Sequence, residues 1–281
     1  MGNVRIPLPW WLAIRVISTI MLLPQVGHAE TVRVSVASIH QPVMAQIATG
    51  FSKATGNMVM LVEKPNCEDV PAGHLSCAAD ATVRDNPSGT TPPFQSTPQA
   101  DIVIEAQDWR AEAVKPGRSV TFAIAQIALW SPDPALIDPK GDVLASQRYR
   151  SISLPEPQEG PFGRATYAVL YKAGVLESIR PRLLTGSTTR ESLRAIESGQ
   201  AQLGFVALPQ VWQEGRLESG SLWIPPLAWY PVIAMTATLV DQTRPSGSKA
   251  STQFLRYLLE PSVQQILLRH GYLAPAGLVS S

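Results

Sequence analysis

Residues 32–62 read VRVSVASIHQPVMAQIATGFSKATGNMVMLV and contain two periodicities. Residues 32–37 alternate apolar and polar side chains, which is the period of a β-strand. The apolar residues that follow are spaced so that they share one face of a helix: Val43, Met44, Ile47, Ala48 and Phe51. Gly56 lies just past this helix, and residues 58–62 indicate a second strand. The order strand, helix, strand predicts a parallel pair and therefore an α/β fold.

The rest of the chain continues this alternation. The pattern predicts further strands over 101–105, 151–154, 203–208 and 232–240, with a long apolar stretch at 120–130. It predicts further helices over 108–114, 164–173, 188–199, 251–260 and 262–270. The sheet-forming residues fall into two blocks, roughly 31–118 and 119–233, and residues 234–276 could join either block.

Three helix starts carry polar or glycine-rich sequence. Ser38-Ile-His-Gln41 and Thr188-Thr-Arg-Glu191 have the form of capping boxes, and Gly160-Pro-Phe-Gly163 opens the helix that Gly174 ends. Free N–H groups and the positive end of the helix dipole allow such starts to bind an anion. Three of them in one cleft would hold a small oxyanion without Lys or Arg, whereas ordinary capping explains each one taken singly.

Residues 1–29 have the three-part pattern of a secretory signal peptide. Arg5 and Arg15 precede an apolar run at 16–23, and Gly27-His28-Ala29 fits cleavage after Ala29. A membrane anchor is the alternative, but the run is far shorter than the ~20 apolar residues that a spanning helix needs. Cleavage would remove two cations and no acid, which changes the formal charge from +1 to −1.

The composition excludes several classes of protein. Of the 281 residues, 45% are apolar and 16% are charged, which indicates a globular chain long enough for two lobes. A formal charge near zero argues against a nucleic-acid partner. The mature histidines, His40, His74 and His270, have no metal or catalytic spacing, and no phosphate loop, dinucleotide motif or nucleophile elbow is present. We interpret these histidines as structural or surface residues, and an enzyme is the weakest interpretation.

Residues 64–100 interrupt the α/β pattern with Pro, Ser, Thr, Asn and Gly. A loop of this length is usually functional, disordered or held by a cross-link. Export would place Cys67 and Cys77 in an oxidising compartment, which favours a disulfide between them. Two free thiols are the alternative. A metal site with His74 is less favoured, because three ligands do not complete a tetrahedral zinc site.

Several segments match one known family in order and spacing. They are the opening VRVSVASIHQPVMAQIATGFSKATG, the PQADIVIEA of 98–106, the GPFGRA of 160–165, the AIESGQAQLGFVAL of 195–208, the YPV of 230–232, and the terminal helices at 254–272. Together they resemble the periplasmic molybdate-binding proteins of ABC importers over roughly residues 31–275.

The resemblance implies a type II periplasmic binding fold, an α/β protein of two lobes with the ligand cleft between them. Residues 30–118 plus 234–281 would form lobe 1 and residues 119–233 lobe 2, with hinges near 118–120 and 232–236. It implies a tetrahedral oxyanion, molybdate or tungstate, held by hydroxyls and backbone N–H groups, and a permease in the inner membrane as partner. We expect a periplasmic monomer without a cofactor. The implied ligand-binding residues are Ser38, Ile39, Phe162, Gly163, Thr188 and Thr189.

Two departures from the family bear on the ligand. The family's second serine ligand of the first lobe has no clear match in 64–97, where Ser76 and Ser88 are candidates. Positions at which some members place an aromatic hydroxyl read Phe162 and Ala207-Leu208. Each lost bond to a dianion would weaken binding about ten- to a hundredfold. A changed ligand, such as another anion or a small organic acid, and a sensory or interaction module therefore stay open as alternatives.

Overall fold

The structure, a computed structural model, describes residues 29–63, 100–109, 118–146, 148–186, 188–240 and 249–275. Residues 1–28, which hold nearly all of the predicted signal peptide, lie outside these ranges. So do Cys67, Cys77, Ser76 and Ser88. The predicted cleavage and disulfide therefore stay predictions.

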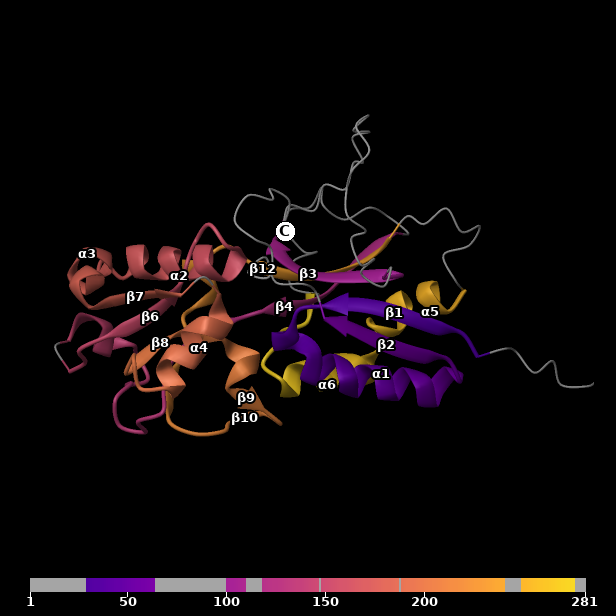
Figure 1. The fold of residues 1–281 in the computed structure, drawn as a ribbon, viewed down its shortest axis with the longest axis horizontal. Coiled ribbons are helices and arrows are strands. Elements are labelled where there is room, and N and C mark those ends of the chain that lie inside the picture. Colours follow the sequence, from indigo (N-terminus) through magenta and orange to yellow (C-terminus); the bar gives the residue numbers. More distant parts are fainter. Residues whose placement is uncertain are drawn as a thin grey trace, which may run out of the picture.

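Two five-stranded sheets build two α/β lobes that lie end to end along the long axis of the molecule (Figure 1). The first sheet has the order β2-β1-β3-β12-β4. Its strands are β1 (Thr31–Val36), β2 (Met58–Glu63), β3 (Ile102–Asp108), β4 (Ser119–Ala125) and β12 (Ile233–Leu239). β1 pairs in parallel with β2 and β3, which confirms the predicted parallel opening, and β12 runs antiparallel to β3 and β4.

The second sheet has the order β11-β5-β8-β6-β7. Its strands are β5 (Ile127–Ser131), β6 (Ile152–Pro155), β7 (Leu183–Gly186), β8 (Leu203–Ala207) and β11 (Ser221–Trp223). β6 is parallel to β7 and β8, and β5 is antiparallel to β8 and β11. A separate hairpin joins β9 (Trp212–Gln213) to β10 (Arg216–Leu217).

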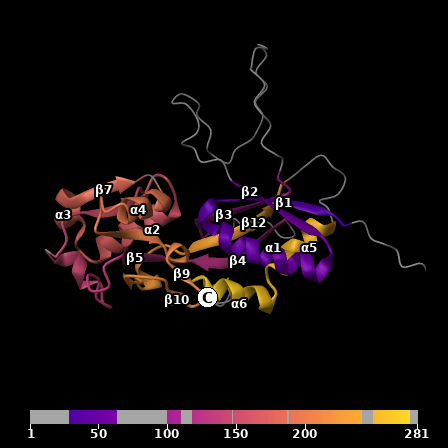
Figure 2. The same ribbon diagram turned by 60° about the horizontal axis from the view of Figure 1, so that its bottom comes forward.

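The chain's last two helices return to the first lobe, as the resemblance implied. α5 (Lys249–Tyr257) packs on β1 and β12, and α6 (Pro261–Arg269) packs on α1 (Gln41–Thr55) (Figure 2). The second lobe carries α2 (Pro161–Lys172), α3 (Leu176–Ile179) and α4 (Thr189–Glu197). Short 3₁₀ helices are η1 (Ser38–His40), η4 (Asp142–Ala145), η5 (Arg180–Arg182), η6 (Leu208–Gln210) and η7 (Leu227–Trp229).

The first crossover between the sheets lies at Gln126, later than the predicted 118–120. The apolar stretch at 120–130 is two strands of different sheets, because β4 pairs with β12 and β5 pairs with β8. Gln126 is held at the junction, where its side chain donates to the Gly271 carbonyl at 3.0 Å and its carbonyl accepts from the N–H of Leu208 at 2.9 Å. An unbroken apolar stretch shows that strands are buried but not which sheet each one joins.

The prediction of a helix over 108–114 is wrong for its first residues. Asp108 is the last residue of β3, and the N–H of Trp109 donates to the Val232 carbonyl at 2.9 Å. The chain therefore stays beside the end of the sheet at 109 because its backbone is paired with the segment that leads into β12. Residues 110–117 lie outside the described ranges.

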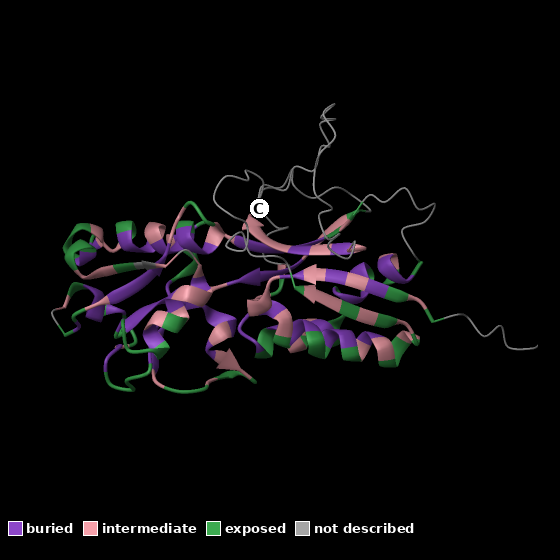
Figure 3. Cartoon of the chain, viewed as in Figure 1, coloured by how far each residue is buried: buried purple, intermediate pink, exposed green. Residues whose placement is uncertain are grey.

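α1 attaches to its lobe through the apolar face read from the sequence, whose five members are all buried (Figure 3). Phe51, which is fully buried, meets Phe254 and Tyr257 of α5 edge-on, with ring centroids 5.1 and 5.3 Å apart. Gly56 ends α1 in the left-handed conformation, with φ of 76°, as its position predicted. Among the described helices, none is long and apolar enough to cross a membrane.

We expect Phe51→Ala to lower the free energy of unfolding by about 3–5 kcal/mol, because it opens a cavity among three aromatic rings of the first lobe. Urea unfolding followed by circular dichroism measures this loss. Tyr171→Ala is the control, since Tyr171 is 81% exposed, and its effect should stay within about 0.5 kcal/mol. Equal losses in the two variants would contradict the proposed role of Phe51.

Candidate ligand-binding site

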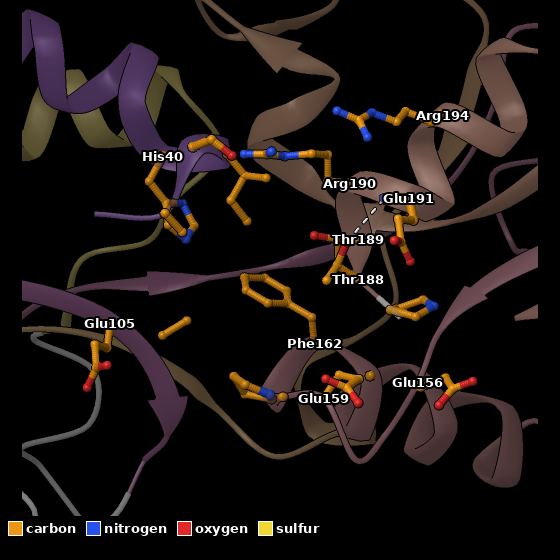
Figure 4. A pocket seen from close by; sticks show the side chains of 18 of the residues that line it. His40, Glu105, Glu156, Glu159, Phe162, Thr188, Thr189, Arg190, Glu191 and Arg194 are labelled. Carbon is orange, nitrogen blue, oxygen red and sulfur yellow. Dashed lines mark hydrogen bonds between the residues drawn. The ribbon is translucent and has the colours of Figure 1, made fainter. Parts of the chain in front are cut away.

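A cavity of about 300 Å³ lies where the two lobes meet (Figure 4). The first lobe lines it with residues 37–40, after β1, and 104–106 of β3. The second lobe lines it with 155–156 and 159–163, between the end of β6 and the start of α2, and with 188–191 and 194 at the start of α4. This volume is at the lower end of the range for small-molecule pockets, which suits a small ligand.

The structure brings the three predicted helix starts together at this cavity. All six residues implied by the family resemblance line it: Ser38, Ile39, Phe162, Gly163, Thr188 and Thr189. Figure 4 shows Phe162, Thr188 and Thr189 near the centre of the site. Sequence alone could not show this convergence, because the residues come from three loops of two sheets. That they contact a ligand stays a prediction.

α2 begins with backbone N–H groups that have no acceptor in the helix. Pro161 occupies the first turn, where its missing N–H is not needed, and the N–H of Arg164 donates to Gly160 at 3.2 Å. The N–H groups of Phe162 and Gly163 are therefore left for a ligand at the cavity. Gly163 has to be glycine, because a Cβ there would lie 1.9 Å from the carbonyl oxygen of Glu156.

α4 begins as its capping sequence predicted. The Thr188 hydroxyl oxygen accepts from the N–H of Glu191 at 3.2 Å, and the Thr188 carbonyl accepts from Ser192 at 3.0 Å. The N–H groups of Thr189 and Arg190 are free of helix partners. Since Thr188 uses its hydroxyl oxygen as an acceptor, its O–H can still donate to a ligand.

Ser38 does not cap α1, which corrects the prediction of a capping box at 38–41. The 3₁₀ helix η1 fills residues 38–40, so that α1 begins at Gln41, with His40 at the capping position and no side-chain cap. The N–H of His40 bonds to Ala37, which leaves the N–H groups of Ser38 and Ile39 without a backbone acceptor in the part of the chain that the structure describes. The inserted turn frees Ser38 for the cavity.

Charged side chains around the cavity are mixed in sign. The lining includes four carboxylates and two guanidiniums: Glu105, Glu156, Glu159, Glu191, Arg190 and Arg194. Figure 4 shows Glu105 and Glu156 on opposite sides of the site. Because these groups give no excess of positive charge, an anion here would depend on backbone N–H groups and hydroxyls. No group of three metal-ligating side chains occurs among the described residues.

Two ion pairs join the lobes beside the cavity. Arg190 at the start of α4 contacts Glu63 at the end of β2, at 2.9 Å, and Arg164 of α2 contacts Asp108 at the end of β3, at 2.7 Å. All four side chains are partly exposed. These two ion pairs bring the lobes into contact beside the site.

His40 is a cavity residue that we interpreted from sequence as structural. Its ring faces that of Phe162, with centroids 6.2 Å apart, and its Nδ1 lies 2.6 Å from the Tyr272 hydroxyl. Burial lowers the pKa of His40 to about 4, so the ring is neutral at neutral pH. The sequence signal that could have identified His40 as a site residue was its position just past the first predicted strand, two residues after Ser38. No feature of the neighbouring sequence indicated that His40 would contact Tyr272, which lies 232 residues away in the chain.

The fold and the interlobe cavity define a two-lobed ligand-binding protein of α/β class. The model of the bacterial extracellular solute-binding protein family matches residues 32–273, and the chain belongs to this family. The family is one of solute-binding proteins, not of enzymes.

Individual relatives agree with this assignment. The chain is 28% identical to the molybdate-binding protein ModA of Azotobacter vinelandii over 251 residues, which cover 89% of this chain and 93% of the relative. It is 33% identical to ModA of Rhodobacter capsulatus over 157 residues, covering 56% and 60%. The solved periplasmic molybdate-binding protein of A. vinelandii superposes with a TM-score of 0.67 at 26% identity, covering 87% of this chain and 99% of that one.

We expect Gly163→Ala to displace the start of α2 and to lower the free energy of unfolding by about 1–3 kcal/mol, because the added Cβ would overlap the Glu156 carbonyl. Thermal unfolding measures the loss. Gly186→Ala is the control, since its Cβ would approach nothing closer than 3.1 Å, and it should cost less. A fully stable Gly163→Ala protein would show that α2 can begin elsewhere.

Proposed function

We propose that this protein captures a tetrahedral oxyanion, molybdate or tungstate, in the cavity between its lobes, and presents it to the permease of an ABC importer. The site would use the Ser38 and Thr188 hydroxyls and the backbone N–H groups of Ile39, Phe162, Gly163 and Thr189. The protein would work in the periplasm after cleavage of its signal peptide.

The observation that carries the proposal is that three segments converge on one small cavity with N–H groups that have no backbone acceptor among the described residues. A tetrahedral anion offers oxygen acceptors in several directions at once, and N–H groups at helix starts supply donors and a favourable dipole. The ModA relatives support molybdate as the ligand. The same donors would contact sulfate, so cavity size must separate the larger anions from sulfate.

Closure of the lobes follows from the same geometry. The donors belong to both lobes, so a bound anion would contact both and favour the closed arrangement. Hinge motion at Gln126 and at the segment before β12 would open the cavity. A permease could then distinguish the loaded protein from the empty one by the relative position of the lobes.

Thermal unfolding of the purified, anion-free protein tests the function directly. Molybdate or tungstate at a thousand times its Kd should add about 4.1 kcal/mol, which raises Tm by about 8 °C or more for a chain of this size. Sulfate should give a much smaller shift. No shift with molybdate, tungstate, sulfate or phosphate would mean that this chain does not bind such anions.

Ser38→Ala should weaken molybdate binding at least about tenfold in isothermal titration calorimetry, because it removes one hydrogen bond to a charged ligand. Ser198→Ala is the control, since Ser198 lies at the end of α4 away from the cavity and is exposed. It should bind like the wild type. Unchanged affinity in Ser38→Ala would remove this hydroxyl from the site.

A changed ligand is the second candidate, and the carboxylates around the cavity favour it. Glu105, Glu156 and Glu159 would repel a dianion, but each could accept a hydrogen bond from a protonated oxygen of a ligand such as hydrogen phosphate or a small organic acid. A Tm shift with phosphate that exceeds the shift with molybdate would support this second candidate over the first.

A further inference from the structure

His40 is a buried polar side chain of the cavity, and the family resemblance gives it no role in ligand binding. It is 3% exposed, it is the last residue of η1, and it lines the cavity from the first lobe. Phe162 from the second lobe faces it, and Tyr272 packs on it from the end of the chain, with ring centroids 5.9 Å apart. The ring is thus held on two sides.

Tyr272 determines which nitrogen of His40 carries the proton. The phenol is 1% exposed, and the bond to Nδ1 is its only hydrogen bond among the described residues. Burial raises the pKa of Tyr272 and lowers that of His40, so both groups are neutral at neutral pH. If Nδ1 carried the proton, the buried phenolic O–H would have no acceptor, which is costly. The phenol therefore donates to Nδ1, and the proton of the ring is on Nε2.

We infer that Nε2 lies on the side of the ring that faces the cavity, because His40 lines the cavity and its other ring nitrogen is turned away from it. The two ring nitrogens point in nearly opposite directions, and Nδ1 is turned to Tyr272, which does not line the cavity. No described group bonds to Nε2. Figure 4 shows His40 on the first-lobe side of the site, with its ring directed toward Phe162 and not toward the charged residues of α4.

We propose that the Nε2–H of His40 is a neutral hydrogen-bond donor to the bound oxyanion, held in this tautomer by the hydroxyl of Tyr272. The inference rests on the proposed function and adds a side-chain donor to the first lobe, where the family's second serine ligand has no described counterpart. A neutral donor suits this site because it needs no buried counter-charge.

Two substitutions separate the nitrogens of His40. In His40→Gln the side-chain amide reaches about as far as Nε2 and keeps a donor at the cavity, whereas in His40→Asn it reaches about as far as Nδ1 and keeps only the partner of Tyr272. Calorimetry with molybdate should show about a ten- to hundredfold loss of affinity in His40→Asn. His40→Gln should stay much closer to the wild type. Tyr272→Phe, which leaves the tautomer free, should show an intermediate loss.

The outcomes discriminate between a ligand contact and a structural role. Unchanged affinity in His40→Asn overturns the proposal, and so do equal losses in the Asn and Gln variants with equal falls in the Tm of the free proteins. If the wild type binds none of molybdate, tungstate, sulfate and phosphate, both the proposed function and this inference are wrong. If the wild type binds molybdate and His40→Asn binds it with the same affinity, this inference is wrong and the proposed function still holds.

A second measurement needs no variant. The imidazole ¹⁵N spectrum of the intact protein distinguishes a protonated ring nitrogen from an unprotonated one. We expect Nε2 to carry the proton in the free protein, and its N–H signal to shift and exchange more slowly when molybdate is added. A proton on Nδ1, or an N–H signal that molybdate leaves unchanged, overturns the proposal.

Discussion

Backbone N–H groups at the first turn of a helix have no acceptor within that helix, and this constraint supplies the cavity with hydrogen-bond donors. In each lobe a strand ends and a helix begins at the edge that faces the other lobe. η1 after β1, α2 after β6 and α4 after β7 therefore bring unpaired donors to one place. Close packing supports this arrangement in the second lobe, where the backbone at Gly163 lies against the Glu156 carbonyl. Within each lobe the donors are thus positioned by the fold of that lobe itself.

The two interlobe ion pairs beside the cavity contribute less free energy than hydrogen bonds from these donors to a charged ligand. Arg190–Glu63 and Arg164–Asp108 involve partly exposed side chains, and such pairs contribute about 0–1 kcal/mol each. A hydrogen bond to a charged ligand contributes about 1.5–3 kcal/mol. A few bonds to an anion would therefore outweigh both pairs in deciding whether the lobes close. These two ion pairs can therefore orient the lobes, but they contribute little to holding them together.

Local sequence patterns predicted the helices and strands well. They could not predict which strands pair when the partners are far apart in the sequence. The buried face of α1, the cap at Thr188 and the stop at Gly56 each depend on neighbours within one or two turns, so their signal lies in adjacent residues. The crossover at Gln126 depends on which distant strand each half of an apolar stretch joins. The capping box at Ser38 had the right residues, but the chain formed a 3₁₀ turn there instead. The convergence of the site was expected only through the family resemblance.

The segment 271–273 connects the candidate site to the crossover. Gly271 accepts from the side chain of Gln126, Tyr272 bonds to His40, and Leu273 exchanges two backbone hydrogen bonds with Ile124 of β4. Three consecutive residues thus hold the strand that leads into the second lobe and the imidazole that faces the cavity. If the second lobe rotates about Gln126, it moves relative to the segment 271–273, which stays attached to the first lobe. The end of the chain therefore keeps the first-lobe half of the site in place while the second-lobe half moves, which is what a cleft that opens and closes on a small anion requires.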